Sequence, residues 1–176
     1  MNEFFKKDLY RYFGDKKISL AQKLLMPPEI KYLKQLRKTQ KKKSALNFLK
    51  LKKMQYKTHI QIGAETKIGE GLYIGHTGRL IINKDAVIGK NCNLATGVTI
   101  GQENRGKRKG CPVIGDNVWV GTNAVIVGNI KIGNDVMIAP LTFVNFDVPD
   151  HSIVVGNPAK VISRENATEG YINHTV

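Results

Sequence analysis

The sequence predicts an all-β fold, a parallel β-helix of hexapeptide repeats, preceded by a short α-helical arm. Aliphatic residues recur every six positions from residue 114 to residue 144, and a smaller or β-branched residue follows four positions later. The same spacing occurs upstream, from residue 62 to residue 100, with one break. A period of six does not match the 3.6 residues of a helical turn, but it suits a short strand followed by a bend. Three such units would complete one triangular coil, and stacked coils would pair in parallel.

The repeated positions should line the interior of the coils, because no single unit can bury its aliphatic side chain alone. The expected first inward positions are Ile62, Ile68, Ile74, Ile82, Ile88, Leu94, Ile100, Ile114, Val120, Ile126, Ile132, Ile138 and Val144. The expected second positions are Thr66, Leu72, Ala86, Cys92, Val98, Val118, Ala124, Ile130, Val136 and Thr142. A β-sandwich is the alternative, but sandwich strands do not recur every six residues without drift.

Charge divides the chain where periodicity divides it. Residues 1–59 contain 17 Lys or Arg and 4 Asp or Glu, whereas the remaining residues contain 11 and 10. Nearly all of the net charge of +14 therefore precedes the repeats. We expect a basic helical N-terminal arm over residues 1–58, a β-helix over residues 59–163 with a loop at 102–112, and a C-terminal tail over residues 164–176.

Apolar spacing predicts short helices within the arm. A first helix should end at Gly14, and a second short helix should end before the Pro27-Pro28 pair. A longer amphipathic helix, broken near residues 41–43, is indicated by Ile30, Leu33, Leu36, Leu46, Leu49 and Met54. The basic face would either dock on an anionic membrane or be solvated on a helical cap. No nucleic-acid motif accompanies the charge, so we expect no nucleic-acid partner.

The sequence contains neither an N-terminal apolar segment typical of a signal peptide nor a long apolar run. We therefore expect a cytoplasmic location, peripheral at the inner membrane face if the arm binds lipid. Two cysteines, Cys92 and Cys111, are too few for a disulfide scaffold and fit a reducing compartment.

The repeat is first interrupted at His76, because Ile82 follows Ile74 after eight residues instead of six. The extra residues should leave the coil at a corner and place His76 on the rim, where two subunits could meet. An imidazole titrates near neutrality and accepts a proton from a hydroxyl, so His76 is our candidate general base. The remaining histidines are expected to be structural: His59, His151 and His174.

Four motifs in order resemble the hexapeptide-repeat acyltransferases: Ile-Gly-His-Thr-Gly at 74–78, the hexads at 86–89 and 97–101, and Gly-Asn-Pro-Ala-Lys at 156–160. Within that family, the chain is similar to serine O-acetyltransferases and their polysaccharide-biosynthesis relatives over roughly residues 58–163. The resemblance implies a left-handed β-helix and a homotrimer. It also implies acetyl-CoA as the acetyl donor, bound between neighbouring coils, with no metal.

The resemblance further implies direct acetyl transfer with His76 as the catalytic base. Cofactor-binding positions would be Gly101, Gly121, Thr122 and Pro140 along the pantetheine, with Asn157, Pro158 and Lys160 near the nucleotide end of CoA. Acceptor-side and loop positions would be Gly75, Arg79, Arg105 and Cys111. The basic loop 102–112 would either reach over the active site, holding a CoA phosphate or an acidic acceptor, or be a mobile solvated loop.

Three departures from the serine acetyltransferases bear on the acceptor. Gly75 stands where that family has Asp, Gln61 stands where an Asp steadies the catalytic His, and Cys111 stands where a second His occurs. The large helical N-terminal domain of that family is also replaced by a short arm. We therefore expect a carbohydrate acceptor, a sugar hydroxyl of a surface polysaccharide or its precursor.

Two alternatives to this activity stay open, and a third does not fit the residues. The first is serine O-acetyltransferase activity in cysteine biosynthesis. The second is a non-catalytic β-helix scaffold, because a fold does not by itself imply a function. A γ-class carbonic anhydrase shares the fold but needs three His metal ligands, and His59, His76 and His151 are not spaced for that role.

Overall fold

The computed structural model describes residues 2–176, apart from the side chain of Lys23. Four helices come first: α1 (Glu3–Phe13), α2 (Leu20–Leu24), α3 (Pro28–Lys41) and α4 (Ala45–Thr58). Short strands follow: β1 (Ile60–Ile62), β2 (Lys67–Ile68), β3 (Tyr73–Ile74), β4 (Leu80–Ile82), β5 (Val87–Ile88), β6 (Asn93–Leu94), β7 (Thr99–Gly101), β8 (Val113–Ile114), β9 (Val118–Val120), β10 (Val125–Val127), β11 (Lys131–Ile132), β12 (Val136–Ile138), β13 (Phe143–Val144), β14 (Ser152–Val155) and β15 (Lys160–Ser163).

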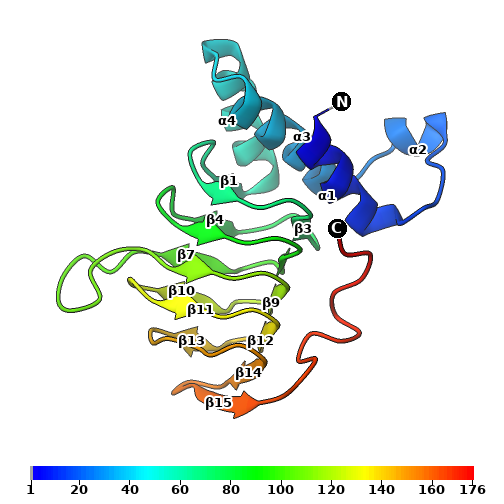
Figure 1. Ribbon diagram of the computed structural model, residues 1–176. Helices are drawn as coiled ribbons and strands as arrows, with labels where there is room; N and C mark the ends of the chain where they lie inside the picture. The colour runs from blue at the N-terminus through cyan, green and yellow to red at the C-terminus, as the bar shows by residue number, and fades with distance from the viewer. Residues whose placement is uncertain (1) are drawn as a thin grey trace.

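The strands form the three faces of a stacked prism, with the helices at one end (Figure 1). Sheet A has the order β1-β4-β7-β10-β13, sheet B the order β2-β5-β8-β11, and sheet C the order β3-β6-β9-β12-β14-β15. From β1 to β14, consecutive strands therefore lie on different faces, and the first four coils visit sheets A, B and C in turn. The pairing is parallel until β15, which folds back antiparallel on β14.

The hexad positions stack in register, as predicted. Ile62 pairs with Ile82, Ile82 with Ile100 and Ile100 with Ile126 on sheet A. All the first and second inward positions are buried. Parallel strands lie about 4.8 Å apart, so each inward side chain rests on the one in the coil before it. This arrangement excludes the β-sandwich.

A column of residues in the left-handed backbone region turns the chain from sheet B to sheet C. Gly71, Asn91, Asn117, Asp135 and His151 have φ between 51° and 74°. Asn and Asp tolerate this region better than other non-glycine residues, because their short polar side chains bond locally. The sequence analysis did not predict this column, although the recurrence of Asn, Asp and Gly before the second inward positions was visible.

The helical arm closes the exposed edge of the first coil. The Tyr32 hydroxyl accepts a hydrogen bond from Ile62 N and donates one to Ile62 O, both at 3.0 Å. The Tyr12 hydroxyl does the same at Ile74, at 2.8 and 2.9 Å. Burial raises the pKa of Tyr32 to about 12, so this hydroxyl stays a donor. Because an open strand edge pairs readily with other chains, these contacts also protect the stack.

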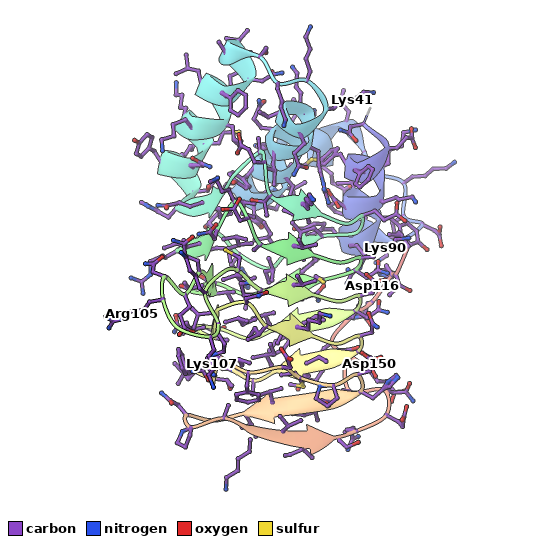
Figure 2. All side chains as sticks on the ribbon, turned by 60° about the vertical axis from the view of Figure 1, so that its left-hand side comes forward. Lys41, Lys90, Arg105, Lys107, Asp116 and Asp150 are labelled. Carbon is purple, nitrogen blue, oxygen red and sulfur yellow. The ribbon has the colours of Figure 1, made fainter. Side chains whose placement is uncertain are left out.

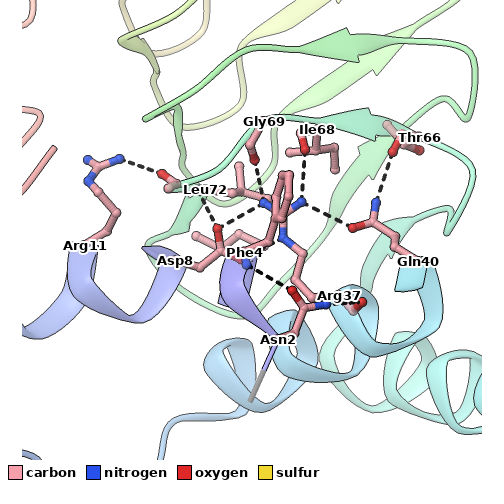
Figure 3. A network of polar contacts seen from close by, with 12 residues as sticks. Asn2, Phe4, Asp8, Arg11, Arg37, Gln40, Thr66, Ile68, Gly69 and Leu72 are labelled. Carbon is pink, nitrogen blue, oxygen red and sulfur yellow. Dashed lines mark hydrogen bonds and ion pairs between the residues drawn. The ribbon is translucent and has the colours of Figure 1, made fainter. Parts of the chain in front are cut away.

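Arg37 closes the third edge, at the end of β2. Its guanidinium donates to Ile68 O at 3.0 Å and Gly69 O at 2.6 Å, and to both carboxylate oxygens of Asp8 at 2.7 and 3.0 Å. Asp8 also accepts from Leu72 N at 2.9 Å. The side chains of Arg37 and Asp8 are only 2% and 0% exposed. This buried network joins α1, α3 and the first coil (Figure 3).

The helix break predicted near residues 41–43 is confirmed, because α3 ends at Lys41 and α4 begins at Ala45. Two of the predicted apolar contacts in α4 are wrong. Leu46 and Leu49 are 59% and 68% exposed, whereas Leu51 is buried and Phe48 is partly buried against the core. The difference arises because α4 packs on α3 and β1 through a different face from the one that we expected.

The C-terminal tail runs back along the outside of the prism and ends beside α1 (Figure 1). Arg11 donates to Asn173 O at 2.7 Å, and Asn91 exchanges hydrogen bonds with Val176 at 2.9 and 3.0 Å. The tail therefore connects distant coils to the helical arm. Within residues 2–176, no helix combines the length and apolarity that crossing a membrane would need.

We predict that Asp8→Asn destabilises the fold severely. It leaves the buried guanidinium of Arg37 uncompensated, which typically costs about 3–5 kcal/mol of unfolding free energy. Glu70→Gln is the matched control, because Glu70 pairs at 2.6 Å with Lys7, whose side chain is 44% exposed, and an ion pair open to solvent contributes about 1 kcal/mol or less. Urea unfolding at equal protein concentrations measures both changes. Equal losses in the two variants would refute the anchoring role of Arg37 and Asp8.

Candidate functional site

The corner where sheet C passes into sheet A carries most of the predicted site. The connections that meet there are β3–β4, β6–β7, β9–β10 and β12–β13, followed by the β14–β15 turn in the last coil. From the first coil to the last, this corner holds Gly75, His76, Arg79, Gly121, Thr122, Pro140, Asn157 and Pro158, and Lys160 opens β15 directly after it. We call this line of residues the C–A edge.

Backbone hydrogen bonds hold the C–A edge together from coil to coil. Asn123 N donates to Thr96 O at 3.1 Å, and Leu141 N donates to Thr122 O at 2.9 Å. In the last coil, Gly156 N donates to the Thr142 hydroxyl at 3.2 Å. The edge is therefore a hydrogen-bonded ladder along one side of the prism.

His76 is exposed at the first coil of this edge. Its loop is fixed at Gly78, whose N donates to Thr58 O at 2.9 Å and whose φ of +127° requires glycine. On the other side, a Cβ at Gly75 would meet only the Tyr73 ring, at 3.8 Å. The His76 side chain is therefore exposed on a fixed loop and accessible to an external substrate, as a general base must be.

Loop 102–112 leaves the prism at a different corner, where sheet A passes into sheet B. Glu103 and Gly110 exchange backbone hydrogen bonds at 2.9 and 3.0 Å, so the loop is a small hairpin. Asn129 N donates to Arg108 O at 2.8 Å and ties this hairpin to the following coil. Its tip carries Arg105 and Lys107, which project from the side of the stack (Figure 2).

The predicted site is therefore divided between two edges of the prism. Gly101, Arg105 and Cys111 lie at the corner between sheets A and B, which we call the A–B edge. His76 and the remaining predicted residues lie on the C–A edge, with sheet A between the two. The sequence analysis grouped these residues as one site without assigning them to separate edges.

Cys111 on the A–B edge is partly buried. Burial raises the pKa of its thiol, and the nearby Asp85 carboxylate adds to that increase. A thiolate is the nucleophilic form of cysteine, so this shift opposes covalent catalysis by Cys111. Gln61, the other departure noted in the sequence, lies exposed on β1 and pairs with Ile81 of β4.

Within residues 2–176, the side chains that commonly bind metal ions do not form a cluster. No group of three or more His, Cys, Asp or Glu side chains lies close enough together to hold an ion. His151 instead bonds to Asp135 at 2.9 Å, and its pKa is raised mainly by that hydrogen bond. Asp135 also accepts from Ala167 N and Thr168 N, both at 3.0 Å, so this pair fixes the C-terminal tail.

Residues 111–145 match the family described as bacterial transferase hexapeptide (six repeats). The chain carries the hexapeptide repeat of these transferases. The resemblance predicted from the motifs is thereby confirmed.

Serine acetyltransferases are among the curated relatives of this chain. Serine acetyltransferase 4 of Arabidopsis thaliana is 41% identical over 103 residues, which cover 58% of this chain and 29% of that protein. The serine acetyltransferase of Synechococcus elongatus is 34% identical over 118 residues, covering 67% of this chain and 48% of that protein. The chain thus spans less than half of either relative.

Solved structures show the same fold. A serine acetyltransferase from Brucella abortus superposes with a TM-score of 0.78 at 23% identity, covering 94% of this chain and 69% of that one. The Neisseria gonorrhoeae enzyme in complex with serine gives a TM-score of 0.74 at 28% identity, with 92% and 68% covered. The predicted left-handed parallel β-helix is therefore confirmed.

Proposed function

We propose that this chain is an acetyl-CoA-dependent O-acetyltransferase whose acceptor is serine. The observation that carries the proposal is the C–A edge, where an exposed His76 heads a column of all the positions that the resemblance assigns to CoA except Gly101. Four strand spacings separate the coil of His76 from the β14–β15 turn, which amounts to roughly 19 Å. An extended thioester arm with its nucleotide at the far end suits such a column.

Serine replaces the sugar hydroxyl that we expected from the sequence, because the relatives reported above are all serine acetyltransferases. A sugar hydroxyl remains the second candidate acceptor, because three residues of this chain differ from those of the serine acetyltransferases. Gly75 and Cys111 stand where the resemblance places an Asp and a His that help to seat the amino acid, and Gln61 stands where it places the Asp that steadies the catalytic His. The acceptor is therefore the point at which the residues and the relatives disagree.

The chemistry proposed for His76 is general base catalysis. The imidazole removes the proton of the acceptor hydroxyl as its oxygen attacks the thioester carbonyl. Backbone N–H groups would stabilise the oxyanion that forms. When the intermediate collapses, the C–S bond breaks, and the imidazolium returns its proton to the departing CoA thiolate. Acetyl passes directly to the acceptor, and no covalent enzyme intermediate is needed.

The donor would lie along the C–A edge. Thr122 and Pro140 are exposed there and would contact the pantetheine, while backbone groups of the ladder offer polar partners. Lys160 is exposed beside the last turn, where its ammonium would meet the phosphates of the nucleotide end. Asn157 and Pro158 would shape that turn, which contains a cis bond between them.

We further propose a homotrimer in which each site is shared by two copies. The C–A edge of one copy would face the A–B edge of its neighbour, which brings Arg105 and Cys111 toward His76. Such a contact joins two different surfaces, so it must close into a ring. Sheet A offers an outward and mostly apolar stripe for packing between the two edges, formed in register by Ile81, Thr99, Val125 and Phe143.

An acceptor assay tests the proposed activity. We expect acetyl-CoA to release CoA thiol at a rate that depends on serine, and O-acetylserine to be detected by mass spectrometry. Nucleotide sugars and oligosaccharides form the comparison arm, and the rate without acceptor is the baseline. Transfer to a sugar alone would move the function to the second candidate. If acetyl-CoA leaves the melting temperature unchanged, it does not bind, and the non-catalytic scaffold becomes the better account.

We predict that His76→Ala lowers acetyl transfer by roughly 10²–10⁴-fold, the usual contribution of a positioned general base. Stability should barely change, because the side chain is exposed. His59→Asn is the control, since His59 is exposed with a φ of 59°, and Asn tolerates that conformation. Wild-type turnover in the His76 variant would contradict the mechanism, as would an equal loss in the control.

A further inference from the structure

We propose that the helical arm contains a surface that docks on an anionic lipid bilayer. Two neighbouring elements form it: the leucines of α2 and its C-cap, and a stripe of lysines along α3. We call it the basic-leucine surface, and it comprises Leu20, Leu24, Leu25, Lys31, Lys34, Lys38 and Lys41. It belongs to the helical arm, which contributes no residue to the chemistry proposed above.

The leucines of this surface face solvent. Leu20, Leu24 and Leu25 are 75%, 71% and 81% exposed. α2 is nevertheless a defined helix, because Ser19 and Gln22 form a reciprocal capping box at its start. Leu20 and Leu24 lie four residues apart, on one face of the helix. A cluster of exposed large apolar side chains typically marks an interaction site.

The lysines lie along the outer face of α3. Lys31, Lys34, Lys38 and Lys41 are exposed, whereas Ile30, Leu33, Leu36 and Arg37 are buried on the opposite face. The stripe is about 15 Å long, at 1.5 Å per residue. The Lys31 ammonium donates to Leu24 O at 3.3 Å, which brings the start of the stripe against α2.

A groove accompanies the far half of the stripe. It is lined by Lys34, Lys38, Lys41, Lys42, Asn2 and Phe5 and measures about 610 Å³. Four of these residues are lysines, so positive charge gathers beside the groove and attracts a phosphate, which is the group that a phospholipid headgroup presents. Lys41 lies at the helical end of the molecule, away from β15 (Figure 2).

Charge on this end of the molecule is almost uncompensated. Among the described side chains of residues 2–59, 13 lysines are exposed, but only Glu3 and Asp15 are exposed acids. Glu3 is paired with Lys6 at 2.6 Å. The remaining two acids, Asp8 and Glu29, are buried. The β-helix and tail carry nearly balanced charge, so the positive field comes from the arm.

Charge and apolarity together select the occupant. A second copy of the same surface would bring like charges together, which opposes self-association. A nucleic acid would satisfy the lysines but would leave the three leucines in water. A bilayer with acidic lipids satisfies both, because leucines enter the interface while lysines meet the headgroups. The C–A edge runs along the side of the stack and stays open in this arrangement (Figure 1).

Vesicle co-sedimentation of the full chain tests this proposal. We expect binding to vesicles of phosphatidylcholine mixed with phosphatidylglycerol and little binding to phosphatidylcholine alone. Raising NaCl from about 0.05 M to about 0.5 M should release most of the bound protein, because screening shortens the range of the lysine charges. Absence of binding to the acidic vesicles at low salt would overturn the proposal.

Two variants locate the surface. Replacing Leu20, Leu24 and Leu25 together by Ser should weaken vesicle binding at least about fivefold. This is the loss expected when at least one leucine no longer inserts into the bilayer interface. Replacing Lys31, Lys34, Lys38 and Lys41 together by Gln should weaken it at least about tenfold, since each lysine near an acidic surface contributes.

The matched control replaces four exposed lysines of the β-helix by Gln: Lys67, Lys84, Lys90 and Lys131. It removes the same net charge and should keep most of the binding. Thermal unfolding verifies that each variant folds. If the lysine variant and its control lose vesicle binding equally, binding depends on net charge alone, and the proposed role of the basic-leucine surface is refuted. Unchanged binding in both the leucine and the lysine variants would also refute it.

Light scattering and DNA binding separate the other occupants. An assembly that grows with concentration and is abolished by the leucine variant would assign this surface to a second copy instead. DNA that displaces the protein from vesicles and binds equally well to the leucine variant would assign it to a nucleic acid. Acetyl transfer in solution should be unchanged in both variants, so this test is independent of the proposed acetyltransferase activity.

Discussion

Each coil of this protein must place its inward aliphatic side chains on those of the coil before it. The requirement fixes the backbone at every strand, because a shift of one residue would turn the aliphatic side chain outward. Extra residues can therefore leave the stack only at its corners. Both interruptions of the repeat obey this rule: the segment around His76 and loop 102–112 each lie between two sheets. The same constraint that builds the core thus confines the candidate chemistry to the edges.

The first coil of such a stack has no coil before it, so the backbone N–H and C=O groups along its outer edge lack strand partners. Here three side chains of the helical arm bond to this edge, one for each sheet: Tyr32 at β1, Arg37 at β2 and Tyr12 at β3. The arm is thus an integral part of the fold and not an appendage. Its inner surface is committed to this closure, which leaves its lysines and the leucines of α2 for other contacts.

The hexad period predicted the coils, the inward positions and both interruptions, because that pattern records burial directly. Periodicity could not say on which edge each interruption lies, since that depends on how many units precede it. It also missed the roles of Arg37 and Asp8, whose pairing spans 29 residues. Leu46 and Leu49 were misassigned because a helical apolar pattern does not tell which face finds a partner. The C-terminal tail contains no hexad repeat, so its sequence did not predict where it would run.

His76 and loop 102–112 emerge on opposite sides of sheet A, so a site that uses both must be shared between copies. This division is the central claim of the account, and it is independent of which acceptor is used. Glu103 and Gly110 are paired across the base of the loop. Replacing residues 104–109 by Gly-Gly therefore removes the tip of the loop and keeps this pair, although it also removes the Arg108 carbonyl that accepts from Asn129 N.

Mixed assemblies test that claim most directly. Copies with His76→Ala and copies with the shortened loop should each be nearly inactive alone. After joint unfolding and refolding in equal amounts, about a quarter of the sites would combine an intact His76 with an intact loop from the neighbour. The account predicts recovery of acetyl transfer to about that fraction. Absence of recovery in well-folded mixed assemblies, or full activity of the shortened-loop protein alone, would contradict it.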